Sequence, residues 1–131
     1  MSKELKTNKV KFSFEDLEVW QKAMELADKV IGVVETLNTN RKHYRLIEQL
    51  ESSATSILMN IAEGKGRYSK KEFIQFLYIA RGSLYETIAL LIIFRKKNWI
   101  DEVQLEELKG FGSEVGRMIS SLINSIKNSM S

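Results

Sequence analysis

The sequence predicts an all-α protein, an antiparallel up-down-up-down four-helix bundle. Three observations carry this prediction. The 131 residues contain no proline, the residue that most often interrupts a helix. Apolar residues recur at spacings of three and four along most of the chain, which is the period of an amphipathic helix. The segments between these stretches are short, and short connections favour neighbouring helices that run in opposite directions.

The apolar period divides the chain into a basic, flexible N-terminal arm over residues 1–12 and a bundle over residues 13–131. We expect helices at about residues 14–37, 42–63, 70–97 and 102–127. The length suits one domain with a real core, not two.

The first helix is predicted from an apolar stripe that consists of Leu17, Trp20, Met24, Ala27, Ile31 and Val34. Two N-caps are possible for this helix: Ser13 with Asp16 three residues later, or Asp16 itself. Residues 38–40, Asn-Thr-Asn, supply the turn that follows.

The second helix is predicted from a stripe that consists of Ile47, Leu50, Ala54, Ile57 and Ile61. Gly64 and Gly66 are the expected C-terminal stop. Residues 52–56 are small and polar, so a neighbouring helix is expected to approach closely there.

The third and fourth helices each begin at a predicted capping box, in which two side chains satisfy the free N–H groups of the first turn. The boxes are Ser69 with Glu72, and Asp101 with Gln104. Apolar pairs flank the boxes in the positions of a hydrophobic staple, namely Tyr68 with Phe73, and Ile100 with Leu105.

The third helix carries more apolar residues than one bundle core needs. Beside its core stripe lies a second one that consists of Ile74, Tyr78, Tyr85, Ile88 and Ile92, and Ile79, Leu90 and Ile93 widen it. A large apolar surface left in water marks an interaction site. We predict an oligomer interface at Tyr78, Tyr85, Ile88 and Ile92; the alternative is a monomer with a broad core.

The residue types for most site chemistry are missing. With no cysteine and one histidine, the chain has no thiolate metal site, no thiol nucleophile and no Glu-x-x-His pairs of a di-iron bundle. His43 is expected to be solvent-exposed near a helix start. We predict no catalytic residues, no metal and no cofactor, and therefore not an enzyme.

Targeting and membrane signals are also missing from the sequence. Residues 1–11 lack an apolar signal core, and the most apolar run, Ile88–Phe94, is far shorter than the roughly 20 residues of a membrane-crossing helix. We expect a cytoplasmic protein with no membrane partner.

A cluster of cations surrounds the predicted start of the third helix, where free N–H groups favour anions. It consists of Lys65, Arg67, Lys70 and Lys71. The predicted topology adds Lys9 and Lys11 at the same end of the bundle. The cluster is either a phosphate-binding corner for RNA or DNA, or an ordinary solvated surface; the net charge of +3 permits both.

Three segments resemble bacterial four-helix bundle proteins known as 23S rRNA intervening-sequence proteins. They are residues 14–23 (FEDLEVWQKA), 60–67 (NIAEGKGR) and 76–86 (FLYIARGSLYE), and the similarity extends over about residues 12–127. Related bundles include the accessory variability protein of diversity-generating retroelements, a basic pentamer that binds nucleic acid and partners a reverse transcriptase. The resemblance implies a homo-oligomer, most simply a pentamer, that binds RNA or DNA; it brings no catalytic residues.

The sequence departs from the family pattern in its second helix. The family often has Gln-Leu-Arg-Arg-Ala-Ala, whereas residues 49–54 read Gln-Leu-Glu-Ser-Ser-Ala. Any role of those arginines toward nucleic acid is therefore lost here. The family's prolines, one after Ile57 and one after the first helix, are also missing, which predicts a straighter second helix.

Taken together, these patterns favour a non-enzymatic oligomeric bundle that binds nucleic-acid backbone through its basic end. The alternative is a scaffold that binds a different protein through its apolar third helix and does not bind nucleic acid.

Overall fold

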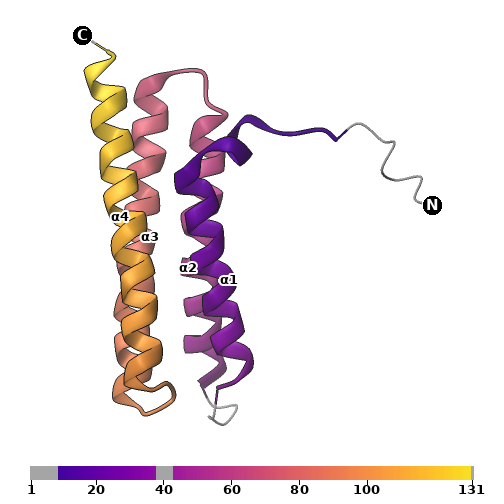
Figure 1. Ribbon diagram of the computed structural model, residues 1–131, viewed down its shortest axis with the longest axis vertical. Helices are drawn as coiled ribbons and strands as arrows, with labels where there is room; N and C mark the ends of the chain where they lie inside the picture. Colours follow the sequence, from indigo (N-terminus) through magenta and orange to yellow (C-terminus); the bar gives the residue numbers. More distant parts are fainter. Residues whose placement is uncertain (1–8, 38–42, 131) are drawn as a thin grey trace, which may run out of the picture.

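The computed structural model describes residues 9–37 and 43–130. In these residues all regular structure is helical: a 3₁₀-helix η2 (Ser13–Asp16) and the α-helices α1 (Glu18–Glu35), α2 (Tyr44–Lys65), α3 (Lys70–Lys96) and α4 (Glu102–Asn128). Successive helices run in opposite directions (Figure 1). The predicted all-α, antiparallel four-helix bundle is confirmed. The turn predicted at residues 38–40 lies outside the described residues, as do residues 1–8 of the predicted arm.

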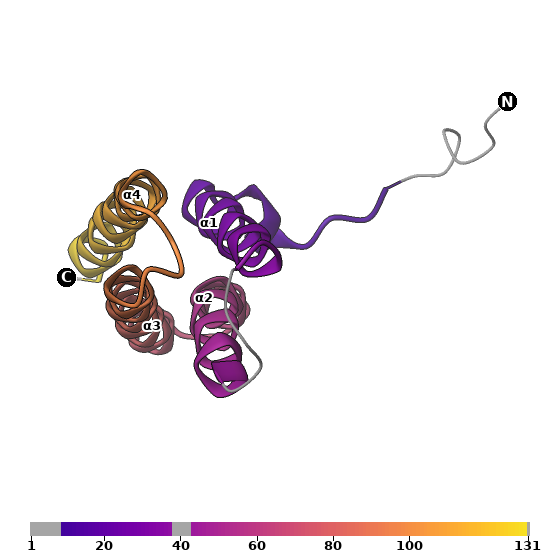
Figure 2. The same cartoon turned by 90° about the horizontal axis from the view of Figure 1, so that it is seen from below.

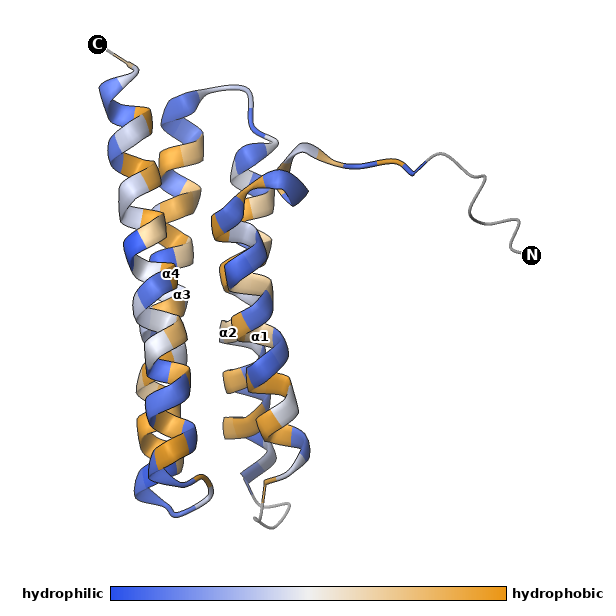
Figure 3. Ribbon diagram, in the orientation of Figure 1, coloured by the Kyte–Doolittle hydropathy of each residue, from blue (hydrophilic) through white to orange (hydrophobic). Residues whose placement is uncertain are grey.

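Each helix packs on its two neighbours around a closed square, α1 on α2, α2 on α3, α3 on α4 and α4 on α1 (Figure 2). The apolar residues, orange in Figure 3, recur along all four helices. At the centre, Leu26, Ile57, Leu77 and Ile119, one from each helix, have no exposed surface. This core is what the helical period predicts.

The core face of α1 differs from the predicted stripe. Its most buried residues include Val19, Ala23, Leu26 and Val30, whereas Met24 is 43% exposed. Apolar residues occupy a broad arc of α1, so the spacing alone allows several overlapping stripes. Contact with α2 and α4 selects the one that is buried.

Both predicted caps of α1 are wrong. Residues 13–16 form η2, and α1 begins only at Glu18, after Leu17 in an extended conformation. The carboxylate that does bond to the backbone is that of Glu15, which accepts a hydrogen bond of 2.8 Å from the N–H of Phe12. The side-chain amide of Gln21 then donates to the Glu15 carbonyl over 2.8 Å, which ties η2 to α1.

Gly64 does not end α2, contrary to the prediction. The helix continues through Lys65, and Gly66 is its cap. Gly64 is buried, and a Cβ there would lie 2.7 Å from the Cβ of Phe76 and 2.9 Å from the ring of Phe73. The missing side chain thus lets α2 and α3 meet closely beside their connection.

The small residues in the middle of α2 do allow the predicted close approach. The hydroxyls of Ser56 and Ser83 lie 2.9 Å apart, and the hydroxyl of Thr87 donates to that of Ser53 over 2.9 Å. Ser53 and Thr87 are both buried. Polar groups in this interface therefore bond to one another across the two helices.

The predicted N-caps of α3 and α4 are confirmed. The Ser69 hydroxyl accepts from the N–H of Glu72 at 3.1 Å. Asp101 and Gln104 form the full reciprocal box, with bonds of 2.8 and 2.9 Å. The staple before α3 is wrong, because Tyr68 is fully exposed. Before α4, Ile100 and Leu105 are both buried.

Helix α3 has the length and composition that a membrane-crossing helix needs, which its short apolar run did not predict. In the bundle, 33% of its most apolar 18-residue window is buried. The buried residues of α3 include Leu77, Leu84 and Leu91. Its high apolar content therefore consists of a core face and a second, exposed face.

Candidate interaction surfaces

The exposed side of α3 is largely apolar. Five of its large apolar residues are each at least 41% exposed: Tyr78, Ile79, Tyr85, Ile92 and Ile93. Three of the predicted interface residues, Tyr78, Tyr85 and Ile92, are in this group. Ile88 is half-buried. We call the five exposed residues the α3 face.

One residue of the predicted second stripe, Ile74, and one of the residues predicted to widen it, Leu90, belong instead to the core. Ile74 is 8% exposed and Leu90 is 4% exposed. Because α2 and α3 make the most extensive helix contact in the bundle, the buried arc of α3 is wider than a single stripe. The exposed apolar surface is correspondingly narrower than the sequence pattern suggested.

A groove of about 840 Å³ lies between α3 and α4, beside the α3 face. Leu84, Ile88 and Ile92 line it from α3. Gly112 and Gly116 line it from α4; a Cβ on Gly112 would lie 2.8 Å from Cδ1 of Ile88. These glycines let apolar side chains of α3 lie against the backbone of α4, which makes the groove apolar.

The charged residues that line the groove are all cations, namely Arg81, Lys109 and Arg117. Arg81 lies over the ring of Tyr78, 5.0 Å from its centroid, and donates to Ser120 over 3.2 Å. Arg117 donates to Ser113 over 3.0 Å. In the described residues neither arginine makes an ion pair, while Lys109 lies 3.7 Å from a carboxylate oxygen of Glu106.

Tyr78 contacts both Arg81, which lines the groove, and Lys127, in the last turn of α4. Its hydroxyl accepts a hydrogen bond of 2.9 Å from the ammonium of Lys127. This bond, together with the positive charges of Lys127 and Arg81, lowers the pKa of Tyr78 below its ordinary value of 10.0.

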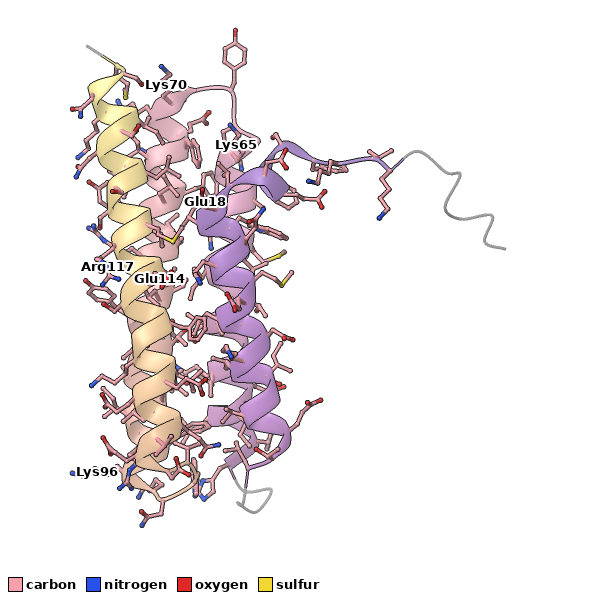
Figure 4. The ribbon with its side chains drawn as sticks, viewed as in Figure 1. Glu18, Lys65, Lys70, Lys96, Glu114 and Arg117 are labelled. Atoms are coloured by element: carbon pink, nitrogen blue, oxygen red, sulfur yellow. The ribbon has the colours of Figure 1, made fainter. Side chains whose placement is uncertain are left out.

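The predicted phosphate ligands near the α2–α3 connection lie at one end of the bundle, whereas residues 9–12 run outward from it (Figures 1 and 2). Figure 4 shows Lys65 and Lys70 there, near the C-terminal end of α4, and Lys96 at the opposite end. The chain also enters α1 at the Lys65 end (Figure 1). The topology therefore brings together segments that are far apart in the sequence.

Three of these cations are engaged within the chain. Arg67 pairs with Glu63 at 2.7 Å and lies over the ring of Phe76. The ammonium of Lys11 bonds to Asp16 at 2.9 Å, which raises the pKa of Lys11. Lys70 donates to the hydroxyl of Ser129 at 3.0 Å, which ties α3 to the C-terminal end of α4.

Lys9, Lys65 and Lys71 make no hydrogen bond or ion pair with the residues that the structure describes. At the start of α3, which includes Lys71, Ser69 already accepts from the N–H of Glu72. The carboxylates of Glu63 and Glu72 stand in the same corner, so the local field is less positive than four clustered cations suggest. We call Lys9, Lys65 and Lys71 the basic end.

His43 is not the exposed residue that was predicted. Its ring is half-buried and lies 4.4 Å from that of Trp99, centroid to centroid. In residues 9–37 and 43–130 no three His, Asp or Glu side chains are grouped as metal ligands. The groove cations Lys109 and Arg117 were not predicted; the signal for them was the run of small residues that surrounds them on the fourth helix.

The fold and these surfaces define a four-helix bundle whose candidate sites are outer faces: an apolar helix side, a cation-lined groove and a basic end. Residues 15–121 match the family described as 23S rRNA-intervening sequence protein, and the chain belongs to this family. The predicted resemblance is thereby confirmed.

A similar solved structure is a protein of unknown function from the S23 ribosomal protein family of Bacteroides thetaiotaomicron. It is 28% identical, with a TM-score of 0.74 over 80% of this chain and 97% of the other. No curated protein matches the chain.

Proposed function

We propose that the protein is a non-enzymatic, self-assembling bundle that binds further copies of itself through the α3 face and nucleic-acid backbone through its basic end. The observation that carries the proposal is the exposed apolar side of α3. The proposal assigns no catalytic residue, metal or cofactor, and it places the protein in the cytoplasm.

Two features of the α3 face support self-assembly. Large apolar side chains in water favour association, because burial removes their surface from water. Tyrosine and arginine are enriched at interfaces, and Tyr85, 69% exposed, stands beside Arg81 at the rim of the groove. A pentamer is the assembly that the family resemblance implies. A ring of copies would repeat the basic end around one axis, so weak phosphate contacts would add up.

Self-assembly is tested by light scattering or sedimentation at micromolar concentration. We expect a mass five times that of the 15.1 kDa chain. Changing Tyr85→Glu and Ile92→Glu together should give a monomer, because both side chains are exposed in one copy and would place charges in the interface.

The matched control is Val103→Glu, an exposed apolar residue at the start of α4 that lies outside the α3 face. It should assemble like the wild type. A monomeric wild type at 100 μM, or a Tyr85→Glu/Ile92→Glu variant that still assembles, would overturn self-assembly through α3.

The basic end supports the second part of the proposal, binding to RNA or DNA. Lys71 lies in the first turn of α3, whose N–H groups favour anions, and Lys65 lies just across the connection at the C-terminal end of α2. Phosphate is an anion that such a corner binds. The family description, which refers to 23S rRNA, points to the same class of partner.

Binding is tested by gel shift with RNA and DNA at low and moderate salt. Wild type should bind at low salt and weaken steeply as salt rises. Reversal of Lys9, Lys65 and Lys71 to glutamate should abolish binding without disturbing the contacts of Arg67 and Lys70. Reversal of Lys96 and Lys97, exposed at the opposite end, is the control and should change little. Absence of wild-type binding at low salt would contradict the nucleic-acid role.

A further inference from the structure

The exposed side of α1 is acidic. Four exposed carboxylates follow it from one end to the other: Glu18, Glu25, Asp28 and Glu35. The two lysines of α1 pair with acids of α4, where Lys22 lies 3.3 Å from Glu114 and Lys29 lies 3.7 Å from Glu107. Of the four acids, Glu25 has an ion pair in the described residues, with Lys22 at 3.4 Å.

The groove between α3 and α4 has the opposite charge. No acidic residue lines it, and its two arginines make no ion pair within the described residues. Figure 4 shows Arg117 on the side of α4 away from α1, and Glu114 on the side toward α1. Cations beside a groove fit a partner that offers carboxylates.

We propose that the acidic side of α1 in one copy docks into the α3/α4 groove of the next copy. This inference rests on the proposed self-assembly and names its partner surface. Charge complementarity selects this pairing. Two grooves placed face to face would bring Arg81 and Arg117 of both copies together, whereas α1 brings carboxylates.

The helix register supports the pairing. The ion pairs Lys22–Glu114 and Lys29–Glu107 fix which residues of antiparallel α1 and α4 lie level with each other. Counting along the helices from these pairs puts Asp28 level with Leu108, and Glu18 level with Met118.

An assembly axis parallel to the helices preserves these levels between copies. Asp28 of one copy then lies level with Lys109 of the next, and Glu18 with Arg117, each to within one residue, a rise of about 1.5 Å. Two opposite-charge pairs therefore form in one register, without sliding one bundle past the other.

The arrangement of the two surfaces determines the symmetry. The outer side of α1 and the α3/α4 groove lie on different sides of the bundle (Figure 2). Each copy therefore has one of each, and contact between unlike surfaces closes into a ring when the assembly axis is parallel to the helices and copies are not shifted along it.

Charge reversal tests the pairing. An α1 variant, Glu18→Lys with Asp28→Lys, and a groove variant, Lys109→Glu with Arg117→Glu, change exposed positions. Each should weaken assembly at least about tenfold, because like charges then face each other. The four changes combined in one chain should restore the wild-type mass, and mixing the two variants should give complexes that contain both, because α1 of each variant is then opposite in charge to the groove of the other.

The control is reversal of Arg45 and Glu48 on α2, both exposed, which should leave assembly unchanged. Circular dichroism melts establish that every variant is folded. Groove-to-groove contact predicts a different pattern, in which the α1 variant assembles normally and the groove variant does not.

Two outcomes separate this inference from the proposed function. In the first outcome, the wild type and both charge-reversed variants assemble normally, and the Tyr85→Glu/Ile92→Glu variant does not assemble. The docking of α1 into the groove is then wrong, while self-assembly through α3 stands. If the wild type is a monomer, both proposals are wrong.

Discussion

The hydroxyl of Thr87 on α3 donates a hydrogen bond to the hydroxyl of Ser53 on α2 over 2.9 Å, and both side chains are buried. The Ser53 hydroxyl in turn donates to the carbonyl of Leu50 at 3.1 Å. These bonds give each of the two buried hydroxyls a partner, and they join the two helices that contact each other most extensively.

We expect Thr87→Val to lower the free energy of unfolding by about 1 kcal/mol, because valine has the same shape and cannot donate to Ser53. Ser53→Ala combined with Thr87→Val should cost less than the sum of the single changes, since both partners are then removed. Urea denaturation measures all three variants. Thr55→Val is the control, because the Thr55 hydroxyl bonds to carbonyls of its own helix, such as that of Glu51 at 2.9 Å. Strict additivity of the two changes would contradict the coupling.

Gly64→Ala should destabilise the protein by about 1–3 kcal/mol, because overpacking forces neighbouring atoms to move. The new Cβ would lie 2.7 Å from the Cβ of Phe76, an atom fixed to the backbone of α3 that cannot turn away. Thermal melts measure the change.

Gly110→Ala is the matched control for this substitution. Gly110 is also in a helix, and a Cβ there would meet nothing within 4 Å. Alanine should therefore stabilise by about 1 kcal/mol through helix propensity alone. If both alanine variants were stabilised alike, the close approach of α2 and α3 at Gly64 would not be what requires glycine.

The contrast at Gly64 explains how far the sequence could predict this fold. The N-caps at Ser69 and Asp101 could be predicted, because each depends on two residues three apart in one segment. The structure contains both caps. Features that depend on contact with a second helix could not be predicted from the sequence. Glycine after an apolar stripe is typical of a helix end, and only the position of Phe76 on α3 shows that Gly64 serves packing instead.

The candidate sites also combine features that one segment determines with features that depend on contact between helices. The excess of apolar residues on the third helix predicted the exposed Tyr85 and Ile92, because a helix that is apolar nearly all round cannot bury every side in a four-membered bundle. The same pattern could not distinguish these exposed residues from Leu90, which the contact with α2 buries. Likewise, the sequence shows that Arg67 and Lys11 carry positive charge. Their ion pairs could not be predicted, because they depend on the geometry of the side chains in the folded protein.

Asn98 ends α3 in the left-handed region, with φ of 63°. Its N–H bonds to the carbonyl of Arg95, and the N–H of Trp99 bonds to that of Phe94, a pattern that closes helix ends. Asn98→Ala should destabilise by about 1–2 kcal/mol, because Cβ crowds the backbone at positive φ and asparagine tolerates this region better. Asn98→Gly should remain near wild type in urea denaturation. Equal stability of the alanine and glycine variants would contradict a role for the left-handed conformation.

The bond between Lys127 and Tyr78 predicts a distinctive titration. Because Lys127 and Arg81 lower the pKa of Tyr78, absorbance of the ionised phenol should rise in a step below pH 10.0. Tyr78→Phe should lose that step, and Lys127→Met should move it upward, because the ammonium that favours the phenolate is gone.

The sign of the linked stability follows from the lowered pKa. The folded state releases the Tyr78 proton at a lower pH than the unfolded chain, so the stabilisation is complete above pH 10.0 and is lost as pH falls through the folded pKa. Comparing urea midpoints of wild type and Tyr78→Phe as pH rises should therefore show a growing advantage for the wild type. The measurement uses the Tyr85→Glu/Ile92→Glu background, in which assembly over the α3 face is removed. A difference between the midpoints that is the same at every pH would show that Lys127 does not favour the ionised phenol.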